Sequence, residues 1–527
     1  MKSLLTRVLA ISLCFFILCP LFLTTEVHAA IPSRPAPQKQ ENDPNDPDAA
    51  QNISSRSLIT EHRGFRDLSQ LFNGQETYFG TTTSDGASLT LEYAEGIGYL
   101  YFIFGDEYGP YTVTNNDTGV SATVGEYLFL HELIDLKQLF GTAATSVTVE
   151  FTSGPAVIYE LTVFTEGYLP GYVQVWEPSK EGETDLILFS THGDDDQLFF
   201  AGVLPYYCAL DYEVLVVYMV DHSMRQSFRL HEMLNGLWGV GVTTYPVWGP
   251  FNDFFGENLQ LAYELYERQG VTRDDIIEYV VTALRKYKPM VVVGHDFAGE
   301  YSHAQHMIYA DCLAAALDIS NDPAQYPELA ESYGVWDVPK AYFHLYEENP
   351  IVMDWDTPME ELGGYTPFEM TQLFGFPYHE SQQPSWVATW INGENFSIKK
   401  ASQITTYSPC EYGLYYSTVG EDVEKNDFFE NVLTYEQQAQ KAEEERLAEE
   451  ARLAEEARLA EEARLEEERR KQEEAAKAAA ATEPEAPTDP EVPTDRIPSG
   501  IKTALPIIAA IVIALAAVVL ARKRRNH

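Results

Sequence analysis

Two short stretches of this sequence combine histidine and aspartate at a spacing that suits a metal ion. One reads FSTHGDDDQLFF, where His192 and Asp195 lie three residues apart in a loop after an apolar run. The other reads GHDFAGEYSHAQH, where His303 and His306 lie three residues apart at the expected start of a helix. Two histidines and one carboxylate, with one coordination place open, are typical of a catalytic zinc site. Each stretch alone is also compatible with a solvated acidic loop or a helix-capping histidine.

Both stretches follow apolar runs of the kind that form strands buried on two faces. The runs DLILFS, YEVLVVYMV and KPMVVVGH alternate with helical segments such as RDDIIEYVVTALRKY. This alternation predicts an α/β, Rossmann-like domain with a mostly parallel sheet over residues 182–435. Ligands of such sheets bind beyond the carboxyl ends of the strands, which is where both stretches are expected to lie.

Three segments, taken in order, resemble the PIG-L/LmbE-like metal-dependent N-deacetylases. The segment STHGDDDQLFFAG is similar to their (A/S)-H-P-D-D-E opening, and GHDFAGEYSHAQH is similar to their later G-H-P-D-H element. Between the two, RLHEMLNGLWGVGV is similar to their R-x-x-E...L-G-V helix. The resemblance covers residues 184–430, and the ordered set is much more specific than any one segment.

The resemblance implies roles for several residues. The metal ligands would be His192, Asp195 and His306, the general base Asp194, and the donor to the oxyanion and the leaving amine His303. Weaker matches place Arg225, Arg229 and His379, the last in YHESQQ, at the substrate. Zn²⁺ is the implied metal, with Fe²⁺ as the alternative. For His379 a buried structural role is the other interpretation.

Three positions depart from the family pattern. Gly193 replaces a proline, Asp196 replaces a glutamate and Gln305 replaces an aspartate. None of these changes removes a ligand or the base, so we expect effects on tuning and substrate choice. For Asp196 we expect a loop-stabilising hydrogen bond. An aspartate at position 305 would stabilise the charged form of His303, so with glutamine there we expect that histidine to lose its proton at lower pH.

Amide hydrolysis needs an electrophile and an activated water. A zinc ion polarises the carbonyl and lowers the pKa of a bound water to about 7. Asp194 would accept the proton of the water, and a protonated His303 would donate to the departing amine. Together with this chemistry, the resemblance implies a zinc-dependent hydrolase that removes N-acetyl groups from a sugar of the N-acetylglucosamine type. The alternative is a catalytically silent surface protein that only binds glycan.

The region before the α/β domain has a different pattern. Residues 57–180 contain short alternating runs such as ASLTLEY and TSVTVEF, bounded by turn residues, which predict an all-β sandwich. The pattern resembles galactose-binding-like, discoidin-type modules, and this resemblance implies a carbohydrate-binding module. A structural spacer without a ligand is the other interpretation. Residues 30–56 are rich in Pro, Asp, Asn and Gln and predict a disordered leader.

The two ends predict export and a membrane anchor. Residues 1–29 have the basic start, apolar run and small-residue cleavage site of a signal peptide. Residues 504–521 form an uncharged apolar run of transmembrane length, and the basic tail 522–527 would remain cytoplasmic. This predicts a single-pass cell-surface protein with an extracellular catalytic domain. Sortase attachment is the alternative, but RIPSGI lacks the Leu-Pro-x-Thr-Gly signal.

Residues 436–480 carry leucine at every sixth position between Leu447 and Leu465. Because each leucine is turned by 240° from the last on an α-helix, no continuous apolar seam forms, and a coiled coil is disfavoured. Glutamate and arginine at i,i+3 and i,i+4 instead predict a solvated single helix, which we interpret as a monomeric stalk. A linker rich in Pro, Thr and Glu would follow over residues 481–503.

The formal net charge of the chain is −46. A field of this sign repels nucleic acid and anionic lipid surfaces, so we expect no nucleic-acid partner and a neutral or cationic ligand. After signal removal three cysteines remain, too few and too scattered for a disulfide framework: Cys208, Cys312 and Cys410.

Overall fold

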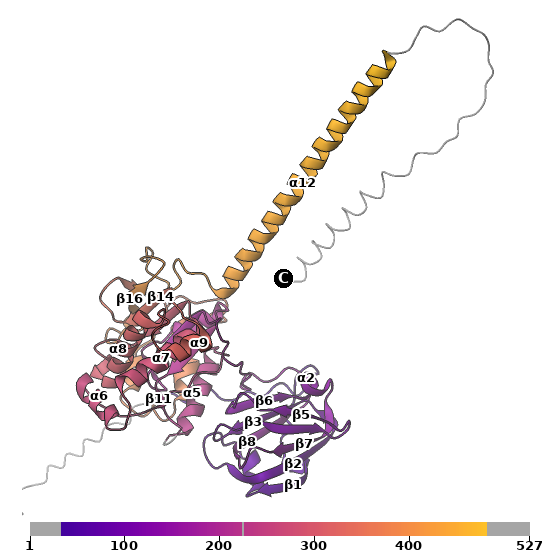
Figure 1. The fold of residues 1–527 in the computed structure, drawn as a ribbon. Helices are drawn as coiled ribbons and strands as arrows, with labels where there is room; N and C mark the ends of the chain where they lie inside the picture. The colour runs from indigo at the N-terminus through magenta and orange to yellow at the C-terminus, as the bar shows by residue number, and fades with distance from the viewer. Residues whose placement is uncertain (1–32, 224–225, 482–527) are drawn as a thin grey trace, which may run out of the picture. The chain divides into compact units, whose positions relative to one another are not determined.

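The computed structural model describes residues 33–223 and 226–481. The chain divides after Ala442 into two compact units. The first holds an antiparallel sheet followed by an α/β domain, and the described part of the second is helical (Figure 1). The predicted signal peptide, transmembrane span and basic tail lie outside the described residues, and so does Arg225.

Residues 59–164 contain one antiparallel sheet of eight strands. Seven strands follow the order β5-β4-β7-β2-β8-β3-β6, and β1 pairs with β2. Alternate residues of β2, including Leu89 and Leu91, are fully buried, as the period of a strand requires. The strands are β1 Ile59–Phe65, β2 Thr81–Ile97, β3 Tyr99–Phe104, β4 Tyr111–Asn115, β5 Val120–Val124, β6 His131–Asp135, β7 Ala144–Phe151 and β8 Val157–Phe164.

The predicted two-sheet sandwich is therefore wrong in its topology. Strand β2 is 17 residues long; its first residues, Thr81 and Thr82, pair with β8, and residues 87–92 pair with β7. Strand β2 thus joins the strands on the β7 side (β5, β4 and β7) to those on the β8 side (β8, β3 and β6), and all of them form a single barrel-like sheet. Alternation in a sequence indicates which face of a strand is buried but not which strands are neighbours. The likeness to galactose-binding modules is not confirmed.

The α/β domain is built on a six-stranded sheet in the order β10-β9-β13-β14-β16-β15. The first four strands are parallel, as predicted, and the last two continue antiparallel. Strand β9 lies between β10 and β13, so its end borders the point where the strand order reverses. The strands are β9 Leu186–Ser190, β10 Val214–Tyr218, β13 Val291–Gly294, β14 Lys340–His344, β15 Pro350–Val352 and β16 Glu411–Ser417.

Helices cover both faces of this sheet. Residues of α5 share one buried cluster with Leu186 and Leu188 of β9, whereas residues of α7 and α8 share another with Ile187 and Phe189. The continuous apolar run of β9 therefore reflects burial on two faces. The helices of this domain are α3 Asp195–Leu198, α4 Val203–Ala209, α5 Phe228–Gly239, α6 Leu259–Glu267, α7 Arg273–Tyr287, α8 Ala304–Ile319, α9 Pro327–Tyr333, α10 Pro367–Met370 and α11 Ala388–Asn392, whereas α2 Leu136–Phe140 lies between β6 and β7.

A buried chain of rings joins the antiparallel sheet to the α/β domain. The Tyr101 hydroxyl lies 2.8 Å from His131 Nδ1, and His131 Nε2 lies 2.9 Å from His231 Nδ1. His131 belongs to β6 and His231 to α5, and all three side chains are buried. Burial lowers the pKa of His131 well below its usual value and that of His231 to about 3. Both histidines are therefore neutral at pH 7.

We expect acid to destabilise the protein through this junction. Below about pH 6.5 the unfolded chain binds a proton on each histidine and the folded chain does not. The free energy of unfolding therefore decreases as the pH is lowered. The His131→Gln variant lacks one of these protons. The stability advantage of the wild type over this variant is thus expected to shrink by about 1.4 kcal/mol per pH unit below 6.5. Urea unfolding of both proteins at pH 7, 6 and 5 measures the change.

Two nearby carboxyl groups have the opposite pH dependence. Burial raises the pKa of Glu132 and of Glu160 to about 7, so the folded chain binds these protons first and gains stability as the pH falls. Both groups are present in the wild type and in His131→Gln, so their effect cancels in the comparison. A stability difference that stayed constant from pH 7 to pH 5 would show that His131 does not titrate as described.

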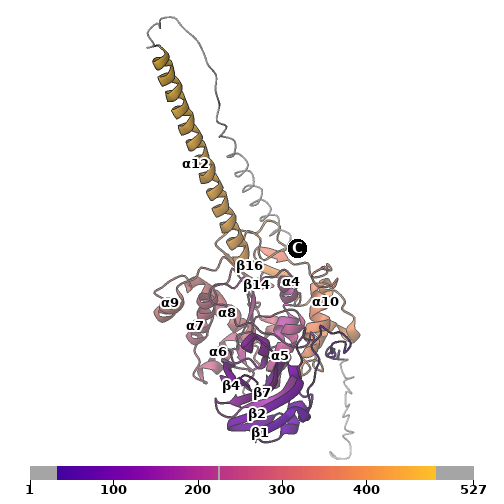
Figure 2. The same ribbon diagram turned by 90° about the vertical axis from the view of Figure 1, so that its right-hand side faces the viewer.

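The predicted helix near the C-terminus is present as α12 Tyr435–Ala480, which is 46 residues long (Figure 2). Ion pairs cover its surface; Arg452, for example, contacts Glu449 at 2.6 Å and Glu456 at 2.9 Å. Leu453 is 51% exposed, and none of the described residues of the helix is buried. These side chains form a solvated helix without an apolar seam.

The predicted stalk leading to a membrane anchor is not supported. Across residues 33–223 and 226–481, no helix has both the length and the apolar composition needed to cross a bilayer, and α12 is long but densely charged. The span predicted at residues 504–521 lies outside the described residues. We therefore correct the prediction of a single-pass membrane protein at the cell surface, which no described helix supports.

Candidate metal centre

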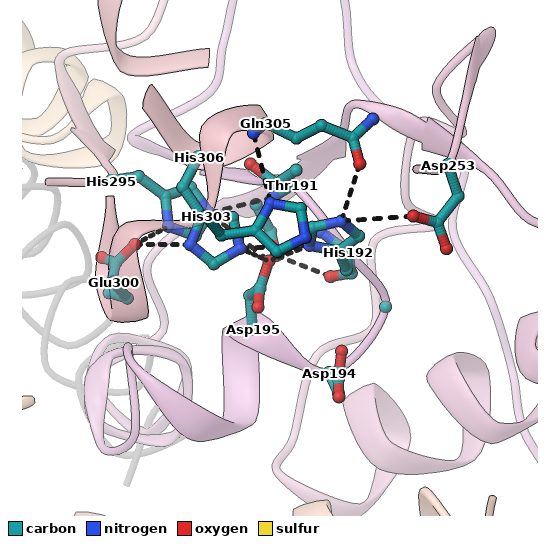
Figure 3. A network of polar contacts seen from close by, with 12 residues as sticks. Thr191, His192, Asp194, Asp195, Asp253, His295, Glu300, His303, Gln305 and His306 are labelled. Atoms are coloured by element: carbon teal, nitrogen blue, oxygen red, sulfur yellow. Dashed lines mark hydrogen bonds and ion pairs between the residues drawn. The ribbon is translucent and has the colours of Figure 1, made fainter. Parts of the chain in front are cut away.

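The two histidine-bearing stretches meet where the strand order of the α/β sheet reverses. His192 follows β9, and His295 follows β13. His303 is the N-cap residue of α8, and His306 lies in the first turn of that helix. All four imidazoles are buried, and Figure 3 shows them gathered around Asp195. The spacing in the sequence thus brings together the residues that were predicted to bind a metal.

Three donor atoms form a nearly equilateral triangle. His192 Nδ1 lies 3.0 Å from Asp195 Oδ2 and 3.1 Å from His306 Nε2, and the remaining side, from His306 Nε2 to Asp195 Oδ2, is 3.2 Å. Ligands of a tetrahedral zinc ion at ~2.0–2.1 Å are separated by about 3.3 Å. A proton or a cation must lie between lone pairs at such distances. The residues therefore fit a zinc ion with three protein ligands.

The hydrogen bonds of the two histidines select the same ligand atoms. His192 Nε2 lies 3.2 Å from Gln305 Oε1, an acceptor, so that nitrogen carries the proton and Nδ1 is left with its lone pair. His306 Nδ1 lies 2.7 Å from the Glu300 carboxylate, which likewise leaves Nε2 free. Asp195 and Glu300, against the opposing effect of burial, raise the pKa of His306 to about 10. A metal ion would displace this proton.

Two further imidazoles lie close to the triangle but use their lone pairs elsewhere. His295 Nε2 accepts the backbone N–H of Thr191 at 3.0 Å, and its Nδ1 lies 2.9 Å from Glu300. His303 Nδ1 accepts the backbone N–H of Gln305 at 3.2 Å, so the neutral ring carries its proton on Nε2. Both rings belong to groups whose potential donor atoms lie within 4.8 Å of one another. Their hydrogen bonds nevertheless favour His192, Asp195 and His306 as the ligand set.

Glu300 is the central polar residue that the sequence analysis missed. It is fully buried, and its two oxygens contact three imidazoles, of His295 at 2.9 Å, His306 at 2.7 Å and His344 at 2.6 Å. Although burial opposes it, these contacts hold the pKa of Glu300 well below its usual value. A carboxylate behind a ligand histidine fixes its tautomer and orientation. The acid in GEYSHAQH, six residues before His306, was the available signal.

Gln305 has a different position from the one expected. Its side chain does not contact the His303 ring; its oxygen contacts His192 and accepts the Phe254 N–H, and its amide nitrogen donates to the Asn252 carbonyl oxygen at 3.0 Å. Asp253, which sequence analysis also missed, lies 3.7 Å from His192 Nε2. Residue 305 therefore orients His192, one of the predicted metal ligands.

Asp194 and Arg229 form a buried ion pair next to the triangle. Arg229 Nη2 donates to Asp194 Oδ1 at 3.0 Å, and both side chains are buried. Burial raises the pKa of Asp194, and the charge of Arg229 opposes this rise. In Figure 3 the Asp194 carboxylate lies apart from the imidazoles, so it is free of the triangle's hydrogen bonds. Arg225, which was predicted to contact the substrate together with Arg229, lies outside the described residues.

His303 is neutral in this environment. Burial and the neighbouring His192 and His306 lower its pKa to about 2. The expectation of an easily deprotonated His303 agrees with this direction, and the largest cause is burial, followed by the two neighbouring imidazoles. The ring can donate one hydrogen bond from Nε2 without carrying a charge.

The other singled-out positions are buried around the site. His379 is fully buried, its two ring nitrogens have no hydrogen-bond partner among the described residues, and burial lowers its pKa to about 3. Asp196 accepts a hydrogen bond from Gln197 Nε2 at 2.7 Å. A side chain at Gly193 would place its Cβ 2.5 Å from the sulfur of Met233, so a proline there would require Met233 to move. The departure at Gly193 thus matches a local packing constraint.

Fold and site together define a class: an α/β domain with two histidines and one carboxylate at its strand ends, placed so that they could hold a single metal ion. Residues 187–317 match the family model described as "PIG-L: GlcNAc-PI de-N-acetylase". This part of the chain is a PIG-L family domain, as the three motifs predicted.

Two curated relatives carry similar sequences. A "1D-myo-inositol 2-acetamido-2-deoxy-alpha-D-glucopyranoside deacetylase 2" of Saccharopolyspora erythraea is 30% identical over 30% of this chain and 52% of its own length. A deacetylase named for the same compound, from Streptomyces scabiei, is 24% identical over 34% of this chain and 56% of its own. The chain thus spans about half the length of the curated relatives it matches.

Among solved structures, the N,N'-diacetylchitobiose deacetylase of Pyrococcus horikoshii, complexed with an inhibitor, is similar to 42% of this chain and 82% of its own. The sequence identity is 14% and the TM-score is 0.28. At this TM-score the likeness supports no assignment of residues or substrate.

Proposed function

We propose that this chain is a zinc-dependent hydrolase that removes the N-acetyl group from an N-acetylated sugar. The observation that carries the proposal is the triangle of His192 Nδ1, Asp195 Oδ2 and His306 Nε2. The names of the two curated relatives support it, because both describe deacetylases of an acetamido sugar joined to inositol. An uncharged substrate of this kind also agrees with a chain of net charge −46.

His192, Asp195 and His306 would hold the metal ion, with Glu300 and Gln305 orienting the two histidines. A zinc ion bound there would act as a Lewis acid towards the amide carbonyl. Asp194 is the general base in this proposal. Its Oδ1 is held by Arg229, so we assign Oδ2 to the attacking water.

The proton balance of the reaction runs through Asp194 and His303. Asp194 takes one proton from the water as the new C–O bond forms, and gives it to the nitrogen as the C–N bond breaks. The products are acetate and the free amino sugar. His303 donates the N–H of its neutral ring to the developing oxyanion, because its lowered pKa excludes a charged acid at pH 7. Arg229 thus acts by holding the Asp194 carboxylate in place. We also propose that Arg229 and His379 contact the substrate.

Acetate release tests this function. Purified full-length protein is incubated with N-acetylglucosaminyl-inositol, N-acetylglucosamine and N,N'-diacetylchitobiose, with and without a chelator that removes zinc. We expect equal amounts of acetate and primary amine from at least one of these sugars, lost with the chelator and restored by added Zn²⁺. Tight binding of these sugars without any acetate release would favour the alternative, a silent glycan-binding protein.

A further inference from the structure

Two large aromatic side chains are exposed beside the metal centre. Phe255 is 62% exposed and Trp386 is 54% exposed. Phe255 lies in the loop after β12 (Phe251–Asn252), and Trp386 lies just before α11. Single exposed hydrophobic residues are common on protein surfaces, but a connected group beside a buried polar site indicates ligand binding.

Both exposed rings contact Tyr301, which lies against the imidazoles. The Phe255 and Tyr301 rings are nearly parallel, at 12° with centroids 6.5 Å apart, and Trp386 meets Tyr301 edge-on at 5.6 Å. Tyr301 lies 5.2 Å from the His303 ring and 5.4 Å from the His306 ring. Phe255 also contacts His303 directly, with centroids 5.1 Å apart. We call Phe255, Tyr301 and Trp386 the aromatic rim.

The aromatic rim is supported from behind. Trp390 packs against Trp386 with centroids 4.5 Å apart, and against Tyr301 at 4.8 Å. Trp386 and Tyr301 are therefore held in place before a ligand arrives, which reduces the entropy lost on binding. Among the described residues the rim is the exposed aromatic group that is continuous with His303.

The chemistry of the rim limits what it can bind. An aromatic face carries partial negative charge and attracts the polarised C–H groups on the flat side of a pyranose ring. An alkyl chain has no such planar face and gains no comparable geometric advantage from stacked rings. The strongly negative chain disfavours an anionic ligand. A neutral sugar is therefore the occupant that the rim fits best.

We propose that Phe255 and Trp386 form a subsite for a neutral pyranose ring that is linked to the N-acetylated sugar. The acetamido group of that sugar reaches the metal centre while its neighbour packs on the rim, so the substrate class is an oligosaccharide or a glycoside with a second sugar ring. This inference rests on the proposed function, since it places the scissile amide at His303 and Asp194.

Binding measured without turnover tests the subsite. Calorimetry on zinc-loaded, full-length Asp194→Asn protein compares N-acetylglucosamine with N,N'-diacetylchitobiose. We expect the disaccharide to bind about tenfold more tightly, as one additional stacked ring warrants. In the same background, Trp386→Ala or Phe255→Ala is expected to abolish this advantage and to leave the affinity for the monosaccharide unchanged, while Trp386→Phe keeps most of it.

Controls separate this inference from the proposed function. Tyr127→Ala removes an aromatic ring that is 53% exposed in the antiparallel sheet region, and should leave both affinities unchanged. An octyl glycoside of N-acetylglucosamine is the alkyl probe. The subsite is overturned if the rim variants weaken only the octyl glycoside, weaken both sugars equally, or leave the disaccharide advantage intact. If the disaccharide advantage depends on the rim but wild-type protein releases no acetate, the subsite stands and the proposed function fails.

Discussion

The Asp194→Asn variant is expected to lose turnover by about 100- to 10,000-fold while it keeps one zinc ion per chain. Asparagine is nearly the same size, and its amide oxygen can still accept the hydrogen bond from Arg229. It cannot accept a proton from water, and it removes no ligand atom of the triangle. The measurement is kcat for acetate release, together with zinc content determined on the same preparation.

The neighbouring aspartate provides the matched control. Asp196→Asn makes the same chemical change two positions further along the chain, in α3, where the side chain accepts its hydrogen bond from Gln197. We expect this variant to retain most of its turnover. Normal turnover in Asp194→Asn, or loss of zinc from that variant, would show that Asp194 is not the base.

Replacing His306 by alanine is expected to remove both the metal and the activity. The side chain supplies one of the three proposed ligand atoms, and its loss also removes one of the imidazole partners of Glu300. Zinc content should fall towards zero and acetate release should become undetectable at any zinc concentration that leaves the protein soluble. Elemental analysis after dialysis against buffered zinc measures the first effect.

Two histidine variants distinguish the ligand sets that the geometry allows. His303→Ala should keep its zinc, because the Nδ1 of that ring already accepts a backbone hydrogen bond and supplies no atom of the triangle. It should lose turnover, because the proposed hydrogen-bond donor to the oxyanion is removed. His295→Asn should bind zinc about 10- to 100-fold more weakly without losing the site, because His295 supplies no atom of the triangle and affects His306 through Glu300 and through ring stacking at 4.3 Å. Complete loss of zinc from either variant, with His306→Ala still loaded, would contradict the assigned triangle.

The clustering of the candidate metal ligands was predictable because its parts follow strands in short, ordered motifs. His192 and Asp195 are three residues apart after β9, and His303 and His306 are three apart at the start of α8, so local geometry already places each pair. Glu300 was not predictable in its role, since its contacts with His295 and His344 depend on how β13 and β14 lie beside each other. Asp253 lies in a loop whose approach to His192 no spacing indicates.

The side-chain partner of Gln305 shows a second limit of the sequence. The position was correctly placed between the two histidines, but on a helix turn its side chain can point either to His303 or across to the β9 loop. The Asn252 carbonyl and the Tyr266 hydroxyl accept and hold its amide nitrogen, and this fixes the oxygen on His192. These partners come from β12 and from α6, which the motif does not contain.

The antiparallel sheet was predictable as strands but not as a topology. Alternation in β2 and β7 correctly indicates one buried face in each. The length of β2, which pairs with β8 at one end and β7 further along, decides that the strands form one sheet. Such pairing depends on contacts distant in the sequence.

A zinc titration of the stripped enzyme tests the central claim most directly. Full-length protein is freed of metal with a chelator, dialysed, and titrated with Zn²⁺ while the rate of acetate release from the best N-acetylated sugar is measured. The account predicts no release without metal, a linear rise, and a break at one zinc ion per chain. Acetate release that survives stripping, or its absence when one zinc ion is bound to each chain, would contradict it.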